Sequence, residues 1–119
     1  MKTGVVGLGY VGLPLLVEIA KSGISAVGID VDTRKVNAIN RGENYISDVK
    51  DEDLTALVKE GKLQATTDWS VISELDAVSI CVPTPLRKTK DPDISFIVNS
   101  VEAMVPYIKD KQLIILEST

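Results

Sequence analysis

The sequence lacks histidine and contains a single cysteine, Cys81. One cysteine cannot form an internal disulfide, and without histidine the chain has neither a Ser/His or Cys/His catalytic pair nor the commonest metal ligand. We therefore expect no metal site. Aromatic residues make up only 4% of the 119 residues, so aliphatic side chains must fill the core. The length and the 45% hydrophobic content suit one globular domain over residues 1–119.

A surplus of basic residues is also missing, because the net charge is -4. No basic run is interleaved with aromatic residues, so a nucleic-acid partner is not expected. Long apolar runs are absent as well, which argues against a membrane span and a signal peptide and favours a cytoplasmic location.

A glycine-rich turn follows the first apolar segment. Residues 7–12 read GLGYVG, and helical spacing begins immediately after them. Such a turn brings unpaired amides and the positive end of a helix dipole to one point, which suits a pyrophosphate. Gly7 would allow the tight turn, Gly9 the approach of a phosphate, and Gly12 close packing of helix on strand. Alone the pattern is weak evidence, because glycine also marks ordinary turns.

Asp30 ends the second apolar segment, 18 residues after Gly12. In dinucleotide-binding folds an acid about 20 residues past the turn binds the adenosine ribose. A carboxylate there accepts hydrogen bonds from both ribose hydroxyls and repels a 2′-phosphate, so NAD is favoured over NADP. The alternative is that Asp30 only caps the next helix, which Asp32 or Thr33 could do equally well.

Short apolar segments alternate with segments of helical spacing along the whole chain. Strands are predicted at 3–6, 26–29, 63–66, 77–82 and 112–116, and helices at 11–22, 33–40, 51–60 and 94–105, with a short helix around Trp69. This alternation predicts an α/β fold, a doubly wound parallel sheet with strand order 3-2-1-4-5. Because a complete dinucleotide domain usually adds a sixth strand, we expect a fragment of a longer protein.

Several side chains have two possible roles. Pro83 and Pro85 stiffen the exit of the fourth strand, so this corner should lie beside the dinucleotide, where Thr84 could contact it; a simple loop entry is the alternative. Trp69 and Cys81 are interpreted as core residues. In the helix over 94–105, the residues expected to face inward are Ile97, Val98, Val101 and Met104.

Four segments in order resemble the NAD-binding domain of the UDP-glucose/GDP-mannose dehydrogenase family. They are GLGYVGLP at 7–14, IDVD at 29–32, CVPTPL at 81–86 and LEST at 116–119. The stretches at 85–86 and 92–95 look most like the branch that oxidises UDP-N-acetylhexosamines. In this family NAD takes two hydrides in succession from C6 of the sugar of a nucleotide sugar, and a primary alcohol becomes a carboxylate through an enzyme-bound thioester.

The resemblance implies a role for each matched position. The glycine turn with Tyr10 and Val11 would hold the pyrophosphate. Asp30 and Lys35 would hold the adenosine ribose, and Thr84 and Thr119 would lie along the nicotinamide half. The family's catalytic cysteine lies beyond residue 119, so the chain is expected to bind NAD without catalysing the reaction, within a homo-oligomeric parent enzyme.

Two other functions are compatible with the motifs. A non-catalytic module that senses NAD would equally lack a complete set of catalytic groups. A methyltransferase can also place a glycine-rich turn before an acid at the end of the second strand, although the third glycine of the turn and the corner at 82–85 argue against it.

Overall fold

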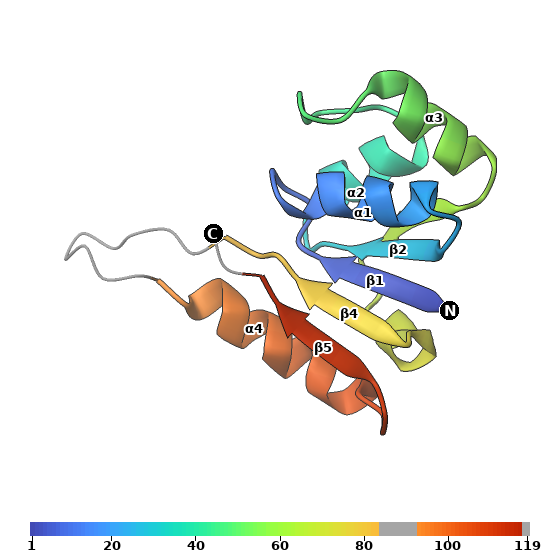
Figure 1. Cartoon of the computed structure of the whole chain (residues 1–119). Helices are drawn as coiled ribbons and strands as arrows, with labels where there is room; N and C mark the ends of the chain where they lie inside the picture. The colour runs from blue at the N-terminus through green and yellow to red at the C-terminus, as the bar shows by residue number, and fades with distance from the viewer. Residues whose placement is uncertain (84–92, 118–119) are drawn as a thin grey trace.

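The computed structural model describes residues 1–83 and 93–117, and its centre is a five-stranded parallel sheet (Figure 1). The strand order is β3-β2-β1-β4-β5, as predicted from the sequence. The strands are β1 (Lys2–Val6), β2 (Ser25–Ile29), β3 (Leu63–Thr66), β4 (Ala77–Ile80) and β5 (Leu113–Leu116). The order reverses between β1 and β4, and this is where doubly wound folds open a crevice at the carboxyl ends of the strands.

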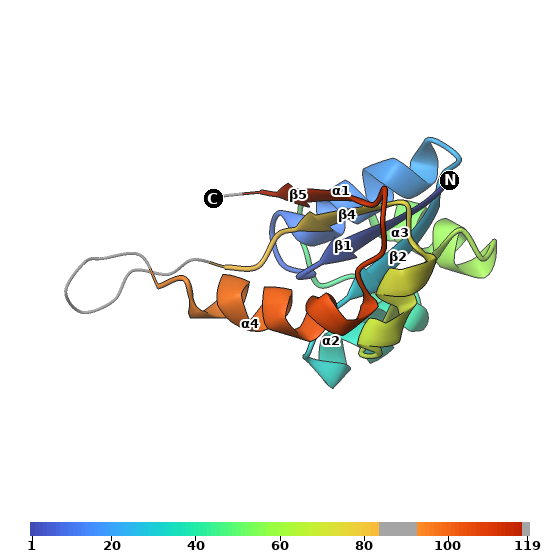
Figure 2. The same cartoon turned by 90° about the horizontal axis from the view of Figure 1, so that it is seen from below.

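Helices cover both faces of the sheet (Figures 1 and 2). One face carries α1 (Gly12–Lys21), α2 (Thr33–Asn40) and α3 (Asp51–Lys59), and the other carries the 3-10 helix η1 (Trp69–Glu74), α4 (Ser95–Met104) and the 3-10 helix η2 (Val105–Tyr107). Because strand side chains alternate, Val5 is buried under the first layer and Val6 under the second. Within the described residues, the helices are too short or too polar to cross a membrane.

Most element boundaries agree with the predictions to within one residue, and the largest difference is at the end of the fourth strand. The fourth strand was expected to run to residue 82 but ends at Ile80, because its partner β1 ends at Val6, where the chain turns away. The last helix ends at Met104 rather than 105, and Pro106 lies in the 3-10 turn that follows it. A proline in this first turn is tolerated because its missing amide would have had no partner.

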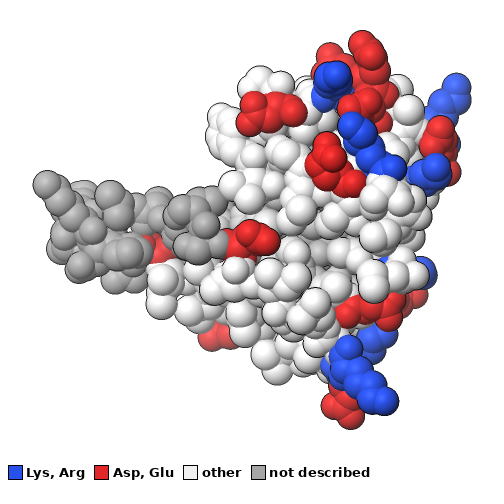
Figure 3. All heavy atoms as spheres, viewed as in Figure 1, with Lys and Arg blue, Asp and Glu red and all other residues white. Residues whose placement is uncertain are grey.

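The inward face of α4 was predicted partly wrongly. Ile97 and Met104 do face the core between the sheet and the second helical layer. Val98 and Val101 do not, and they are 42% and 39% exposed. The reason is that α4 packs against η1 and η2 rather than over the end strand, and this arrangement also leaves every residue of β5 exposed. In Figure 3 charged side chains of both signs gather over α3, whereas the surface over α4 and β5 is largely uncharged.

Two glycines allow α1 to pack directly on the end of β1. Gly7 has a φ of 93°, in the left-handed region that favours glycine. A Cβ on Gly12 would overlap the carbonyl oxygen of Gly7, which is backbone and cannot move aside. Gly9 lies between them in open space, with no atom within 4 Å of a Cβ added there.

We expect Gly12→Ala to destabilise the fold and Gly9→Ala to leave it intact. The overlap at Gly12 should cost at least the upper end of the roughly 1–3 kcal/mol typical of overpacking, whereas Gly9→Ala should change stability by less than about 1 kcal/mol. Urea unfolding followed by circular dichroism measures both. Equal stability of the two variants would show that the helix start can relax around the added methyl group.

Candidate functional site

The glycine turn leaves a row of backbone donors without partners. The Gly7 amide donates to the Ile29 carbonyl at 2.8 Å, which anchors the turn to β2. Among the described residues, the amides of residues 9–12 face no protein acceptor, and α1 has no side-chain cap and no acidic residue in its first turn. Unpaired amides at the positive end of a helix dipole attract an anion. The start of α1 can therefore accept phosphate oxygens.

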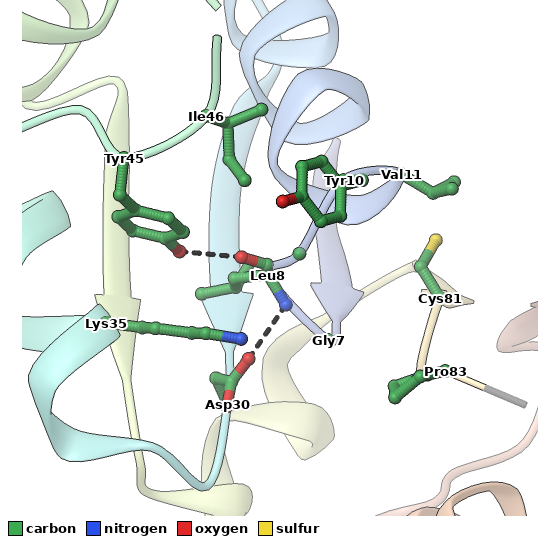
Figure 4. A pocket seen from close by; sticks show the side chains of 11 residues that line it. Gly7, Leu8, Tyr10, Val11, Asp30, Lys35, Tyr45, Ile46, Cys81 and Pro83 are labelled. Atoms are coloured by element: carbon green, nitrogen blue, oxygen red, sulfur yellow. Dashed lines mark hydrogen bonds between the residues drawn. The ribbon is translucent and has the colours of Figure 1, made fainter. Parts of the chain in front are cut away.

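Asp30 is the acidic group of this site, and its side chain connects the turn to β2. The residue is only 9% exposed. Its Oδ2 accepts the Leu8 amide at 2.8 Å (Figure 4). Its Oδ1 accepts the Asp32 amide at 2.9 Å. Each carboxylate oxygen can accept two hydrogen bonds. Asp30 thus keeps accepting capacity for hydroxyl groups after both backbone bonds are made.

Asp32, not Asp30, caps α2. Its side chain accepts the Arg34 amide at 2.9 Å, and this hydrogen bond lowers the pKa of the Asp32 carboxyl. The capping alternative for Asp30 is therefore wrong, because a neighbouring carboxylate performs that task. Arg34 lies 3.5 Å from the same carboxylate and is almost fully exposed, so of the two basic residues here only Lys35 reaches the site.

Tyr45 belongs to the site although the sequence analysis did not identify it. It lies between α2 and α3, and its hydroxyl donates to the Leu8 carbonyl at 2.6 Å (Figure 4). Partial burial raises the pKa of the Tyr45 phenol, and the charges of Asp30 and Asp32 raise it further. The hydroxyl therefore stays a donor at physiological pH. No local sequence signal points to this contact, since the segment reads only as a polar loop.

Two cavities meet over the turn. The larger, about 700 Å³, extends across the start of α1 and up to Tyr45, and the smaller, about 420 Å³, lies between the end of β2 and α4. Both are lined by Gly7, Asp30, Lys35 and Pro83. These four residues come from three segments of the chain, which the strand-order reversal brings together.

The structure brings most of the predicted positions to these cavities. Tyr10 and Val11 line the larger one and are 79% and 38% exposed. Trp69 packs partly against the core and also lines the smaller cavity, so it is not solely a core residue. Thr84 and Thr119 lie outside the described residues.

Cys81 also borders the larger cavity, but its surroundings disfavour the thiolate form that a nucleophile needs. It is 6% exposed, and burial, with a smaller contribution from the charge of Glu117, raises the pKa of its thiol to about 11. A protonated thiol is a poor nucleophile and a poor metal ligand. Within residues 1–83 and 93–117 no cluster of three or more acidic or cysteine side chains could hold a metal ion.

Comparison with known proteins connects this site to one family. The family described as UDP-glucose/GDP-mannose dehydrogenase family, NAD binding domain, matches residues 1–119. A UDP-N-acetyl-D-mannosamine dehydrogenase from Methanococcus maripaludis is 40% identical over 99% of this chain. The match spans only 28% of that protein's own length.

Solved structures agree with the sequence comparison. A UDP-D-ManNAc dehydrogenase from Pyrococcus horikoshii superposes with a TM-score of 0.91 at 33% identity, covering 100% of this chain and 28% of its own. A ternary complex of GDP-mannose dehydrogenase from Pseudomonas aeruginosa gives a TM-score of 0.90 at 29% identity, again over 100% of this chain and 28% of the other. The chain belongs to the UDP-glucose/GDP-mannose dehydrogenase family and forms its NAD-binding domain.

Proposed function

We propose that NAD lies across the carboxyl edge of the sheet with its pyrophosphate at the start of α1. The observation that carries this proposal is the buried Asp30 carboxylate beside a row of unpartnered amides at residues 9–12. The amides would hold the phosphate oxygens, and Asp30 with Lys35 would hold the adenosine ribose. Tyr10 and Val11 would belong to the pyrophosphate site, and Pro83, Thr84 and Thr119 would lie along the rest of the cofactor.

The same carboxylate would decide between the two nicotinamide cofactors. A 2′-phosphate would have to approach Asp30, whose two oxygens already accept backbone amides and cannot turn away without breaking them. Repulsion between the two negative groups disfavours NADP. Lys35 lines both cavities and offers a positive charge, but it sits beside the acid rather than replacing it.

In a longer protein, this domain would serve the oxidation of a UDP-sugar at C6 to a carboxylate. When bound, NAD supplies a hydride acceptor. The chain's own residues would position it through the amides of residues 9–12 and through Asp30. The substrate class is supported by relatives named for UDP-N-acetyl-D-mannosamine, and we infer a UDP-N-acetylhexosamine oxidised with two NAD in a homo-oligomeric enzyme. The domain alone would bind NAD without turnover, because its one cysteine, Cys81, is not the family's catalytic cysteine: Cys81 is buried and the pKa of its thiol is raised.

We expect Asp30→Asn to weaken NAD binding and to narrow the preference for NAD over NADP. The asparagine side chain has only one oxygen, so one of the two backbone N–H groups that the Asp30 carboxylate now accepts would face an NH2 group. This lost hydrogen bond should lower the free energy of unfolding by about 1–3 kcal/mol. Calorimetric titration of both cofactors, with urea unfolding in parallel, measures the two effects. Asp76→Asn is the charge-matched control, because the Asp76 carboxylate also accepts a backbone amide, that of Lys2 at 2.8 Å, and Asp76 lines neither cavity. Equal affinity for NAD and NADP, in both the wild-type chain and Asp30→Asn, would contradict the proposal that Asp30 binds the adenosine ribose.

Gly9→Ala should fold normally and bind NAD more weakly. The added methyl group meets no protein atom within 4 Å, so it would fill only the space where a phosphate approaches the backbone. We expect a loss of at least about tenfold in affinity, the equivalent of about 1.4 kcal/mol, measured by calorimetry. Unchanged affinity would place the pyrophosphate elsewhere.

Cys81 should react slowly with iodoacetamide at pH 7.5. A pKa near 11 leaves a thiolate population about two orders of magnitude below that of an ordinary cysteine, and burial adds to the protection. Because the chain has one cysteine, mass spectrometry reports this site directly, with the urea-unfolded chain as control. Native and unfolded chains reacting at the same rate would contradict a buried, protonated thiol.

A further inference from the structure

The segment between α2 and α3 is folded tightly enough to hold a side chain against the glycine turn. The Asn44 side chain accepts the Ile46 amide at 2.9 Å and donates to the Val49 carbonyl at 2.6 Å and to an Asp51 carboxylate oxygen at 2.9 Å. Ile46 and Val49 are buried in the core of the first helical layer. Tyr45 is therefore presented from an ordered segment, and its hydrogen bond costs little further side-chain entropy.

The Leu8 backbone is held on both sides. Its amide donates to Asp30 at 2.8 Å, and its carbonyl accepts the Tyr45 hydroxyl at 2.6 Å. The peptide bond between Leu8 and Gly9 is trans, so its carbonyl and its amide point in opposite directions. Holding the Leu8 carbonyl toward Tyr45 therefore fixes the Gly9 amide on the side away from Tyr45.

The hydrogen bond from the Tyr45 hydroxyl to the Leu8 carbonyl also affects the first turn of α1. In a regular helix the carbonyl of Leu8 would accept the amide four residues later, which is that of Gly12. Here the carbonyl is taken by the Tyr45 hydroxyl, and the Gly12 amide faces no acceptor among the described residues. Tyr45 thus gives the Leu8 carbonyl a hydrogen-bond donor and leaves the Gly12 amide unpartnered within the described residues.

We propose that Tyr45 is a positioning residue for the pyrophosphate of NAD, holding the Leu8 carbonyl so that the amides of residues 9–12 stay available to phosphate oxygens. This inference rests on the NAD placement proposed above. Tyr45 would act through the backbone and need not touch the cofactor. Its contribution should appear only for ligands that carry a pyrophosphate.

The test compares ADP-ribose with adenosine on wild type and Tyr45→Phe, using amide shifts of the 15N-labelled 119-residue chain. Loss of one hydrogen bond should weaken ADP-ribose about two- to tenfold and leave adenosine unchanged. Tyr107→Phe is the control, because it also removes one phenol hydroxyl and Tyr107 lines neither cavity. Equal losses for both ligands, or no loss for ADP-ribose, would overturn the proposal.

A second readout needs no substitution. In the wild-type chain, the amide signals of residues 9–12 should shift with ADP-ribose and stay in place with adenosine. Amide signals of residues 9–12 that remain unmoved while ADP-ribose binds would overturn the role of Tyr45, even if Tyr45→Phe failed to fold. A wild-type chain that binds neither ADP-ribose nor NAD would instead overturn the NAD placement itself, and with it the role of Tyr45.

Discussion

The two hydrogen bonds accepted by the Asp30 carboxylate are the constraint on which the site depends. A buried carboxylate must be hydrogen-bonded, because an unpaired charge with little access to water is expensive. Asp30 meets this need with the amides of Leu8 and Asp32. In doing so it fixes the glycine turn after β1 relative to the start of α2. One side chain thereby links the two segments that would hold the phosphates and the ribose.

The sheet topology explains why the site lies where it does. Parallel strands end on the same edge, and the reversal of order between β1 and β4 separates the connections on either side of it. Gly7, Asp30 and Pro83 follow β1, β2 and β4 and border both cavities. The cavities share these residues, so a long ligand can span them while its centre meets the start of α1.

The two sides of the sheet differ in how completely they are covered. Under α1, α2 and α3 the strands bury a continuous aliphatic core. At the edge of the sheet, by contrast, the end strand β5 exposes all four of its apolar residues. On the neighbouring helix α4, Val98 and Val101 are also exposed to solvent. Contiguous exposed apolar surface is typical of a contact region. The chain spans about 28% of the length of the relatives it matches.

The sequence by itself determined the alternation of elements, the strand order, the glycine turn and the placement of Asp30 at the end of β2. The elements and the turn follow from hydrophobic periodicity and from residue types that favour particular backbone conformations, both of which are local. The strand order follows from the alternation of strands and helices, because crossovers between parallel strands are right-handed. Only the tertiary structure decided that Tyr45 holds Leu8, 37 residues away, that Asp32 rather than Asp30 caps α2, and that Val98 stays exposed. Such outcomes depend on how loops and layers pack against one another, which periodicity does not encode.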